Sequence, residues 1–223
     1  TSADLYFYGD IVSSWWGAWE DTDQYPDKVK NFLDEAKGKD LNIYVNSGGG
    51  SVFAGMAIYN MIKRHQGNKT VYIDGLAGSI ASVIALAGDK VVIPSNAYMM
   101  IHKPWTYTCG NSNELREQAN VLDTIEEGIM NVYKNNLKDG VDIEEVRELV
   151  NAETWLTGEE ALKYFDVELS ESVDVVACVS DFYDRYNKVP KTISNKTQNK
   201  ELSKDKEIEN KEQIEKEKYL VEL

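Results

Sequence analysis

The chain has 223 residues, 42% of them hydrophobic, so it is long enough for one sizeable domain and an appendage. Its formal net charge of −14 argues against a nucleic-acid-binding surface, because phosphate binding needs clustered lysine and arginine. The longest apolar stretch, around 83–87, is too short and interrupted to span a membrane, and from the residues at 1–19 we expect no signal peptide.

Strands and helices alternate through most of the chain. In order, we expect a strand at 4–12, a helix at about 26–36, a strand at 41–45, a helix at 53–65, a strand at 69–74, a short apolar helix at 78–88, strands at 90–94 and 97–102, a long helix at 113–137, helices at 142–150 and 157–165, and a last segment at 168–176. This alternation indicates βαβ units and a mostly parallel sheet, that is, an α/β fold.

Two segments stand apart from this alternation. The irregular stretch after the first strand holds Trp15, Trp16 and Trp19, which we expect to be packing anchors rather than a ligand cage. From Lys191 onward the chain has eight lysines and eight acidic residues, so the net charge belongs to the body. This tail has too few apolar residues to fold alone and is predicted to be disordered or a solvated helix. We therefore expect a domain at 1–188 and a tail at 189–223.

The glycine turn "NSGGG" joins the strand at 41–45 to the next helix. Glycines permit positive φ and the close approach of another backbone. The sequence is consistent with a plain tight turn, and equally with a loop whose bare N–H groups bind an extended peptide and an oxyanion.

Ser79 follows Gly78 where a strand passes into an apolar helix. A hydroxyl there meets the positive end of the helix dipole, and the N–H of Ile80 would point toward an oxyanion, as at the nucleophile elbow of hydrolases. The alternative is that Ser79 only caps the helix. Ser82 lies one turn further on, and we expect it to face packing.

Only two histidines exist, so a histidine base must be His65 or His102. His65 ends a helix, where capping and the helix dipole explain it. His102 ends a strand, where open α/β proteins place their sites, and is the better base. A carboxylate should then fix the imidazole tautomer. With 38 acidic residues, spacing alone cannot choose one, and Glu153 is equally consistent with an ordinary solvated acid.

Cys109 and Cys178 are far apart and are typical of reduced thiols in a cytoplasmic protein.

Three blocks of the sequence resemble the Clp-type serine protease family. They are "YVNSGGGSVFAGMAIYNMI", "YIDGLAGSIASVIALAGDKVVIPSNAYMMIHKPW" and "AETWLTGEEALKYFDV", in the family's order, and the likeness covers roughly residues 5–175. The chain is most similar to the phage-encoded, Clp-related head-maturation proteases. The resemblance implies the spiral of βαβ units shared by Clp proteases and crotonases, with a long helix, and a serine endopeptidase that needs neither cofactor nor metal.

The resemblance also implies roles for particular residues. Ser79 corresponds to the nucleophile, His102 to the general base and Glu153 to the orienting acid of the triad. Most cellular Clp subunits have aspartate at the third position, so the glutamate is one methylene longer.

The glycine turn likewise takes its expected role from the resemblance. The N–H groups of Gly50 and Ile80 would form the oxyanion hole, and Gly49, Ser51 and Val52 would bind the substrate backbone as a strand-like edge. Cellular members have Pro-Gly-Gly in this turn, so three glycines make it floppier but keep its N–H donors.

Several functions stay open at this point. The resemblance implies a homo-oligomeric ring that cleaves a protein or peptide substrate in the cytoplasm, with capsid or scaffold proteins as partners if it acts in prohead maturation. A housekeeping Clp subunit working with an ATP-dependent unfoldase is the nearest alternative. A crotonase-like acyl-CoA enzyme and a non-catalytic assembly protein would share the fold. The helix predicted at 113–137 has its apolar residues along one face. That face would contact another subunit of a ring or would pack within the molecule.

Overall fold

The computed structural model describes residues 2–172 and 186–190. The first compact unit of the chain is Thr1–Lys188. The predicted tail after residue 190, the end of the segment predicted at 168–176, and Cys178 lie outside the described residues. The described strands are β1 (Ala3–Phe7), β2 (Leu41–Ser47), β3 (Lys69–Gly78), β4 (Lys90–Pro94), β5 (Tyr98–Ile101), β6 (Thr154–Thr157) and β7 (Glu168–Ser170).

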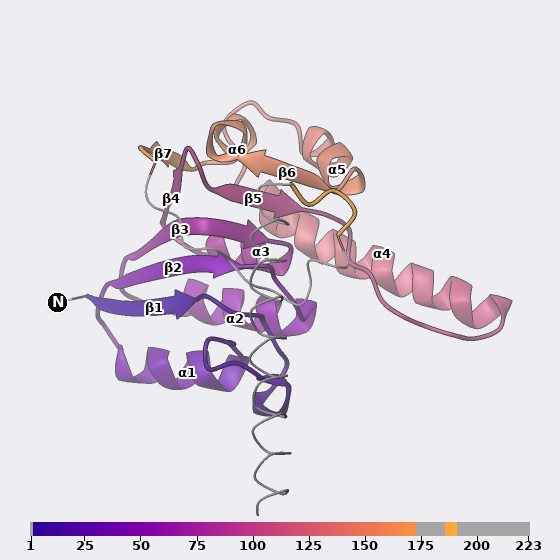
Figure 1. Ribbon diagram of the computed structural model, residues 1–223, viewed down its shortest axis with the longest axis horizontal. Coiled ribbons are helices and arrows are strands. Elements are labelled where there is room, and N and C mark those ends of the chain that lie inside the picture. Colours follow the sequence, from indigo (N-terminus) through magenta and orange to yellow (C-terminus); the bar gives the residue numbers. More distant parts are fainter. Residues whose placement is uncertain (1, 173–185, 191–223) are drawn as a thin grey trace, which may run out of the picture. The chain divides into compact units, whose positions relative to one another are not determined.

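These strands form one mixed sheet in the described part of the chain, and the predicted α/β fold is confirmed (Figure 1). The order β1-β2-β3-β4-β7 is parallel throughout. The far end of β3 pairs with β5 in parallel, and β5 pairs with β6 in antiparallel orientation. The sequence pattern does not predict β6, because its four residues are too few for an alternation and directly precede the capping box of the next helix.

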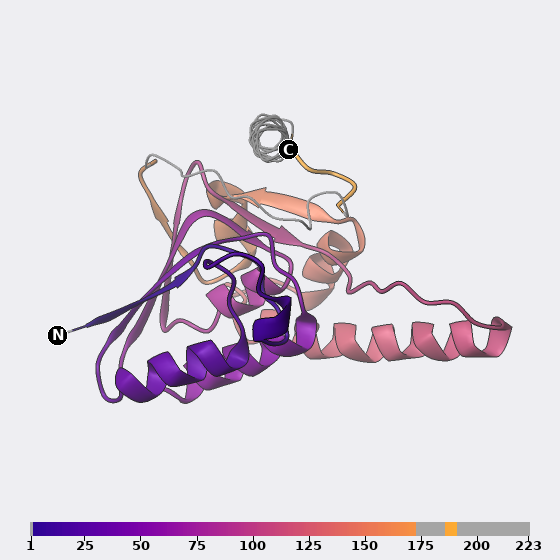
Figure 2. The same cartoon turned by 60° about the horizontal axis from the view of Figure 1, so that its bottom comes forward.

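The helices agree with the predicted ones to within a few residues. They are α1 (Pro26–Glu35), α2 (Val52–Arg64), α3 (Ile80–Ala85), α4 (Ser112–Lys134), α5 (Ile143–Asn151) and α6 (Gly158–Tyr164). Helices α1 and α2 cover one face of the sheet (Figures 1 and 2). Every residue of α3 is buried, as the apolar sequence predicts.

The long helix α4 projects away from the sheet (Figures 1 and 2). Its second half packs into the core through Ile129 and Tyr133, which are almost fully buried. Its first half leaves Leu115 and Val121 more than 40% exposed, so the predicted apolar stripe is only partly covered within this chain. Among the described helices, none has both the length and the apolar character needed to cross a membrane.

The tryptophans after β1 do not anchor the core, so that prediction was wrong. Trp15, Trp16 and Trp19 are 58%, 76% and 88% exposed, and the first two belong to a 3-10 turn, η1 (Trp15–Gly17). The segment is held instead by the buried Asp23, whose carboxylate accepts hydrogen bonds from three backbone N–H groups at 2.9, 3.0 and 3.1 Å. A polar centre, which hydrophobic patterning does not detect, therefore orders this loop.

Candidate active site

A strained bend between β3 and α3 carries Ser79. Its φ of 53° and ψ of −125° are unusual for a residue other than glycine, and such strain is concentrated at functional sites. The N–H of Ser79 donates to the carbonyl of Met100 at 2.8 Å, which fixes the bend against β5. The side chain makes no capping hydrogen bond to α3, so the simple helix-cap interpretation does not describe it.

Strand register brings three candidate residues to one place. The last β3–β5 pair is Gly78 with Met100, so Ser79 and His102 both follow immediately beyond the paired strands. The last β5–β6 pair is Ile101 with Thr154, so His102 and Glu153 are the next positions across that antiparallel pair. Residues distant in sequence thus meet at the carboxyl end of β5, where parallel sheets place their sites.

His102 and Ser79 are in direct contact. The Nε2 atom of His102 lies 2.8 Å from Oγ of Ser79, which is hydrogen-bond distance. Burial lowers the pKa of the His102 imidazole, and the Glu153 carboxylate partly offsets this effect by favouring the charged form. The imidazole is therefore neutral near pH 7 and able to accept the serine proton.

Glu153 is buried beside this pair, being 9% exposed, and has a positive φ of 50°. Among the described residues, its carboxylate accepts hydrogen bonds from the C-terminal segment and none from His102. The Nδ2 of Asn187 donates to one oxygen at 2.9 Å, and the backbone N–H of Lys188 donates to the other at 2.7 Å. The carboxylate acts on His102 through its charge in this structure.

The glycine turn packs directly on the serine bend. At Gly49, where φ is 103°, a Cβ atom would lie 2.7 Å from the carbonyl oxygen of Gly78 and 2.8 Å from Cβ of Ser79. Real Cβ atoms do not approach so closely, so only glycine allows this contact. The turn is thereby held within reach of any group that is bound to Ser79.

One edge of the turn is already paired within the chain. The carbonyl of Gly49 accepts from the N–H of Ile11 at 2.8 Å, and the N–H of Ser51 donates to the carbonyl of Ile11 at 2.7 Å. These bonds form a parallel bridge between Ile11 and Gly50. In such a bridge, the N–H and carbonyl of Gly50 point away from Ile11. The Ser51 hydroxyl caps α2, accepting from the N–H of Ala54. On the predicted substrate-binding edge, the carbonyl of Gly49 and the N–H of Ser51 are therefore already used by Ile11.

A groove of about 670 Å³ opens over Ser79 and His102. Its walls come from the loop after β1, the glycine turn, the start of α2, the segment after β5, α4 and Tyr186. Most of the lining side chains are apolar or aromatic; among them are Val12, Phe53, Trp105, Val121, Ile125 and Tyr186. Gly50, Ser51 and Val52 line it too, whereas Gly49 packs against Gly78 and Ser79. The groove is large enough for several residues of an extended peptide.

The other two candidates from the sequence, Ser82 and His65, lie outside the contact between Ser79 and His102. Ser82 is fully buried, donates to the carbonyl of Ser79 at 2.6 Å and contacts the hydroxyl of Tyr133 at 2.8 Å, so it is a packing residue as predicted. His65 ends α2, and its Nε2 lies 2.7 Å from the carbonyl of Lys39, away from the groove.

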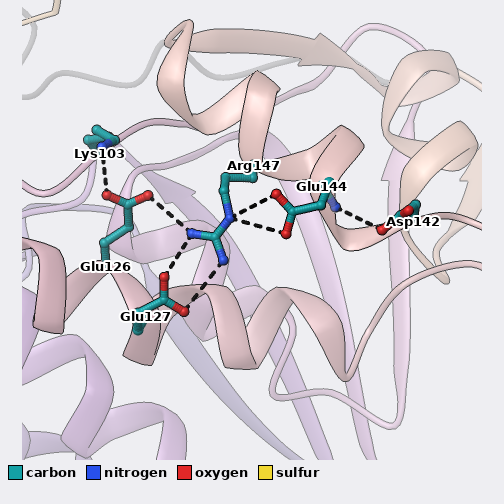
Figure 3. Close-up of polar contacts among 6 residues, drawn as sticks. All are labelled: Lys103, Glu126, Glu127, Asp142, Glu144 and Arg147. Atoms are coloured by element: carbon teal, nitrogen blue, oxygen red, sulfur yellow. Dashed lines mark hydrogen bonds and ion pairs between the residues drawn. The ribbon is translucent and has the colours of Figure 1, made fainter.

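An ion-pair network ties the segment after His102 to two helices (Figure 3). The buried Glu126 of α4 pairs with Lys103 at 2.9 Å and with Arg147 of α5 at 3.6 Å. Arg147 also pairs with the exposed Glu127 at 2.9 Å and with Glu144 at 3.3 Å. The network therefore joins the residue next to the histidine to α4 and α5.

Replacing Glu126 by alanine is expected to lower the free energy of unfolding by about 1–3 kcal/mol, because two cations lose a buried partner but remain partly solvated. Replacing Glu127 by alanine is the matched control. It breaks an exposed pair on the same helix and should cost less than about 1 kcal/mol. Urea unfolding of both variants measures the difference, and equal effects would contradict a structural role for Glu126.

The structure also brings in residues that the sequence does not single out. Ile11 pairs with the glycine turn, and Tyr186, Asn187 and Lys188 contact the site from the C-terminal side. These last three lie beyond the recognised sequence blocks, in a stretch rich in charged and polar residues, so no local pattern marks them. Only the aromatic character of Tyr186 could have suggested a packed contact.

A serine at a strained bend, in contact with a neutral histidine and a glycine-lined turn, is the arrangement that serine hydrolases use. Residues 27–165 match the profile described as Clp protease, and this chain belongs to the Clp protease family.

Individual relatives agree with that assignment. The chain is 32% identical over 132 residues to the ATP-dependent Clp protease proteolytic subunit of Borreliella afzelii, covering 58% of this chain and 66% of the relative. It is 32% identical over 137 residues to the protein of the same name from Porphyromonas gingivalis, covering 60% of each. The match thus spans less than two thirds of these relatives. The solved structure of a ClpP1 point mutant from Listeria monocytogenes superposes with a TM-score of 0.62 and 25% identity, covering 77% of this chain and 92% of the other.

Proposed function

We propose that the chain is a serine endopeptidase that cleaves protein or peptide substrates through an acyl-enzyme. The observation that carries this proposal is the 2.8 Å contact between Ser79 and His102 at a strained bend beside the glycine turn. Membership of the Clp protease family supports the same conclusion. The proposal needs no metal or cofactor.

In the first step, Oγ of Ser79 attacks the peptide carbonyl carbon while its proton passes to Nε2 of His102. The resulting tetrahedral oxyanion accepts hydrogen bonds from the N–H groups of Gly50 and Ile80, each worth roughly 3 kcal/mol of transition-state stabilisation. The C–N bond then breaks, and His102 gives its proton to the leaving amine. Water, activated by the same histidine, hydrolyses the ester and restores Ser79.

Glu153 is proposed to be the orienting acid of the triad. As the reaction makes an imidazolium of His102, a buried negative charge nearby stabilises it. The carboxylate acts through its charge, because its two oxygens accept hydrogen bonds from Asn187 and Lys188.

The substrate is proposed to lie extended in the groove over Ser79. Gly50 presents to the substrate backbone the side of the turn that faces away from Ile11, and the apolar walls take the substrate side chains. Such a surface favours unstructured segments with apolar residues, since folded proteins do not present an extended backbone.

The assembly is proposed to be a homo-oligomeric ring. The support is the first half of α4, which projects from the sheet with Leu115 and Val121 exposed. Uncovered apolar side chains on a projecting helix are typical of a subunit contact.

The biological setting has two candidates. The charged segment at 189–223 supports processing of capsid or scaffold proteins during prohead maturation, because housekeeping subunits do not need such an appendage. The names of the relatives favour a proteolytic subunit that works with an ATP-dependent unfoldase. Stimulation of casein cleavage by an unfoldase and ATP would favour the second, and loss of procapsid processing in a Ser79→Ala variant would favour the first.

Labelling with a serine-directed fluorophosphonate, followed by peptide mapping and native mass measurement, tests the proposal. We expect one label per subunit on Ser79, and a mass several times that of one chain. The variant His102→Ala should abolish labelling, whereas His65→Ala should leave it unchanged because His65 lies outside the groove. A label on Ser82, or labelling independent of His102, would contradict the assignment. Hydrolysis of an acyl-CoA thioester in place of peptides would favour the crotonase-like alternative.

A further inference from the structure

The segment Tyr186–Lys188 lies on the candidate active site, although it follows the part of the chain that matches the family profile. Tyr186 is 8% exposed and is followed by polar residues. A buried aromatic residue at that place needs a specific partner surface.

Tyr186 connects the histidine to the glycine turn. Its ring meets the His102 ring edge-on, with centroids 5.1 Å apart and an interplanar angle of 81°. Its hydroxyl donates to the carbonyl of Gly48 at 2.5 Å, and its ring also meets the indole of Trp155 edge-on at 6.0 Å. Such edge-to-face contacts restrict the rotation of both rings. One side chain therefore restrains the orientation of the base and the position of the turn that carries Gly50.

The next two residues hold the carboxylate. Asn187 and Lys188 donate one hydrogen bond to each oxygen of Glu153, and the ammonium group of Lys188 also donates to the carbonyl of Ala152. Bonds to a buried charge are about twice as strong as those between neutral groups. The two donors thus fix where the negative charge lies relative to His102.

We propose that Tyr186 and Asn187 are positioning residues of the protease: Tyr186 aligns His102 with the glycine turn, and Asn187 holds the Glu153 carboxylate beside the imidazole. This inference rests on the proposed function. Tyr186 acts on the reaction through the His102 ring and the carbonyl of Gly48, and Asn187 acts through the Glu153 carboxylate.

The groups around His102 determine in which direction the acidic limb of the kcat/KM profile moves in the variants. Glu153 faces it from the residue before β6, and Lys103 adjoins it in sequence but is neutralised by Glu126 of α4. Ser79 and Tyr186 are its uncharged neighbours. The base must be deprotonated to act, so kcat/KM falls on the acidic side at the pKa of His102. Removing the Tyr186 ring admits water, which raises that pKa toward its ordinary value.

The experiment compares Tyr186→Ala, Tyr186→Phe and Asn187→Ala in the full chain, using a fluorogenic peptide for kcat, KM and the pH profile. For Tyr186→Ala we expect kcat to fall about 10- to 100-fold, KM to rise because the ring also lines the groove, and the acidic limb to move to higher pH. Tyr186→Phe keeps the ring, so its acidic limb should stay in place while kcat falls less. For Asn187→Ala we expect kcat to fall about tenfold.

The matched control is Asn42→Ala. Asn42 also donates to a carboxylate, that of Asp4 at 2.8 Å, but on the far end of β2, so its kinetics should be unchanged. Wild-type kinetics in both Tyr186→Phe and Asn187→Ala would overturn the proposal. A rise of kcat in any of the three variants would also overturn it, because it would mean that the segment obstructs the site. Fluorophosphonate labelling of the wild-type chain separates this failure from that of the proposed function: without labelling of Ser79 the protease assignment itself fails.

Discussion

Replacing Ser79 by alanine is expected to reduce cleavage of an unstructured protein such as casein by roughly 10³- to 10⁶-fold. The variant keeps the bend, the glycine turn and the groove, but it has no oxygen to attack the carbonyl. Residual activity would come only from the oxyanion donors acting on bound water. Initial rates at several substrate concentrations measure the loss, which should appear in kcat rather than in KM.

Ser82→Ala is the matched control for this result. The hydroxyl of Ser82 is buried and contacts both the Ser79 carbonyl and Tyr133, so its removal should cost about 1–2 kcal/mol of stability. Activity should remain within about tenfold of wild type, because Ser82 does not face the groove. Undiminished turnover by Ser79→Ala would refute the proposed mechanism, and a comparable loss in Ser82→Ala would mean that packing of the bend, not the Ser79 hydroxyl, limits the rate.

Replacing Gly49 by alanine is expected to lower kcat by about 10²- to 10³-fold, because the new methyl group displaces the turn from the serine bend. The Cβ atom would lie 2.7 Å from the Gly78 carbonyl oxygen and 2.8 Å from Cβ of Ser79, so the two backbones must move apart. The oxyanion donor of Gly50 then shifts by a fraction of an ångström. The positive φ of Gly49 adds strain of about 1–3 kcal/mol to the folded state.

Gly38→Ala is the matched control, because it introduces backbone strain without displacing a neighbouring segment. Gly38 has a positive φ of 78°, but a Cβ atom there would meet nothing within 4 Å. This variant should lose about 1 kcal/mol of stability and no activity. Thermal melts and kcat for both variants make the comparison. If Gly49→Ala retained wild-type kcat, the contact between the turn and the nucleophile bend would not matter for catalysis.

The local pattern of the sequence was sufficient for most of the secondary structure. Alternating residues of β2 and β3 point into the core, and the helical spacing of α2 and α4 is regular, so each signal lies within one short segment. The pairing of Ser79 with His102 could also be predicted from the sequence, because the chain has only two histidines and one of them ends a helix. Glu153 was not within reach of spacing alone and depended on the resemblance.

The failures concern groups whose environment is set by distant parts of the chain. Trp15, Trp16 and Trp19 are exposed because Asp23, not an apolar face, organises their loop. The pairing of Ile11 with the glycine turn, nearly forty residues later in the chain, was not predicted either.

The α/β alternation, the glycine turn and the candidate pair of Ser79 and His102 followed from the sequence, because they depend on residue type and spacing within a segment. Tertiary structure alone decided which groups surround the base. The register of β3, β5 and β6 brings Ser79, His102 and Glu153 together, and hydrogen bonds across 34 and 138 residues attach Asn187 to Glu153 and Tyr186 to Gly48. Contacts over such separations depend on how the elements pack, and no local pattern encodes them.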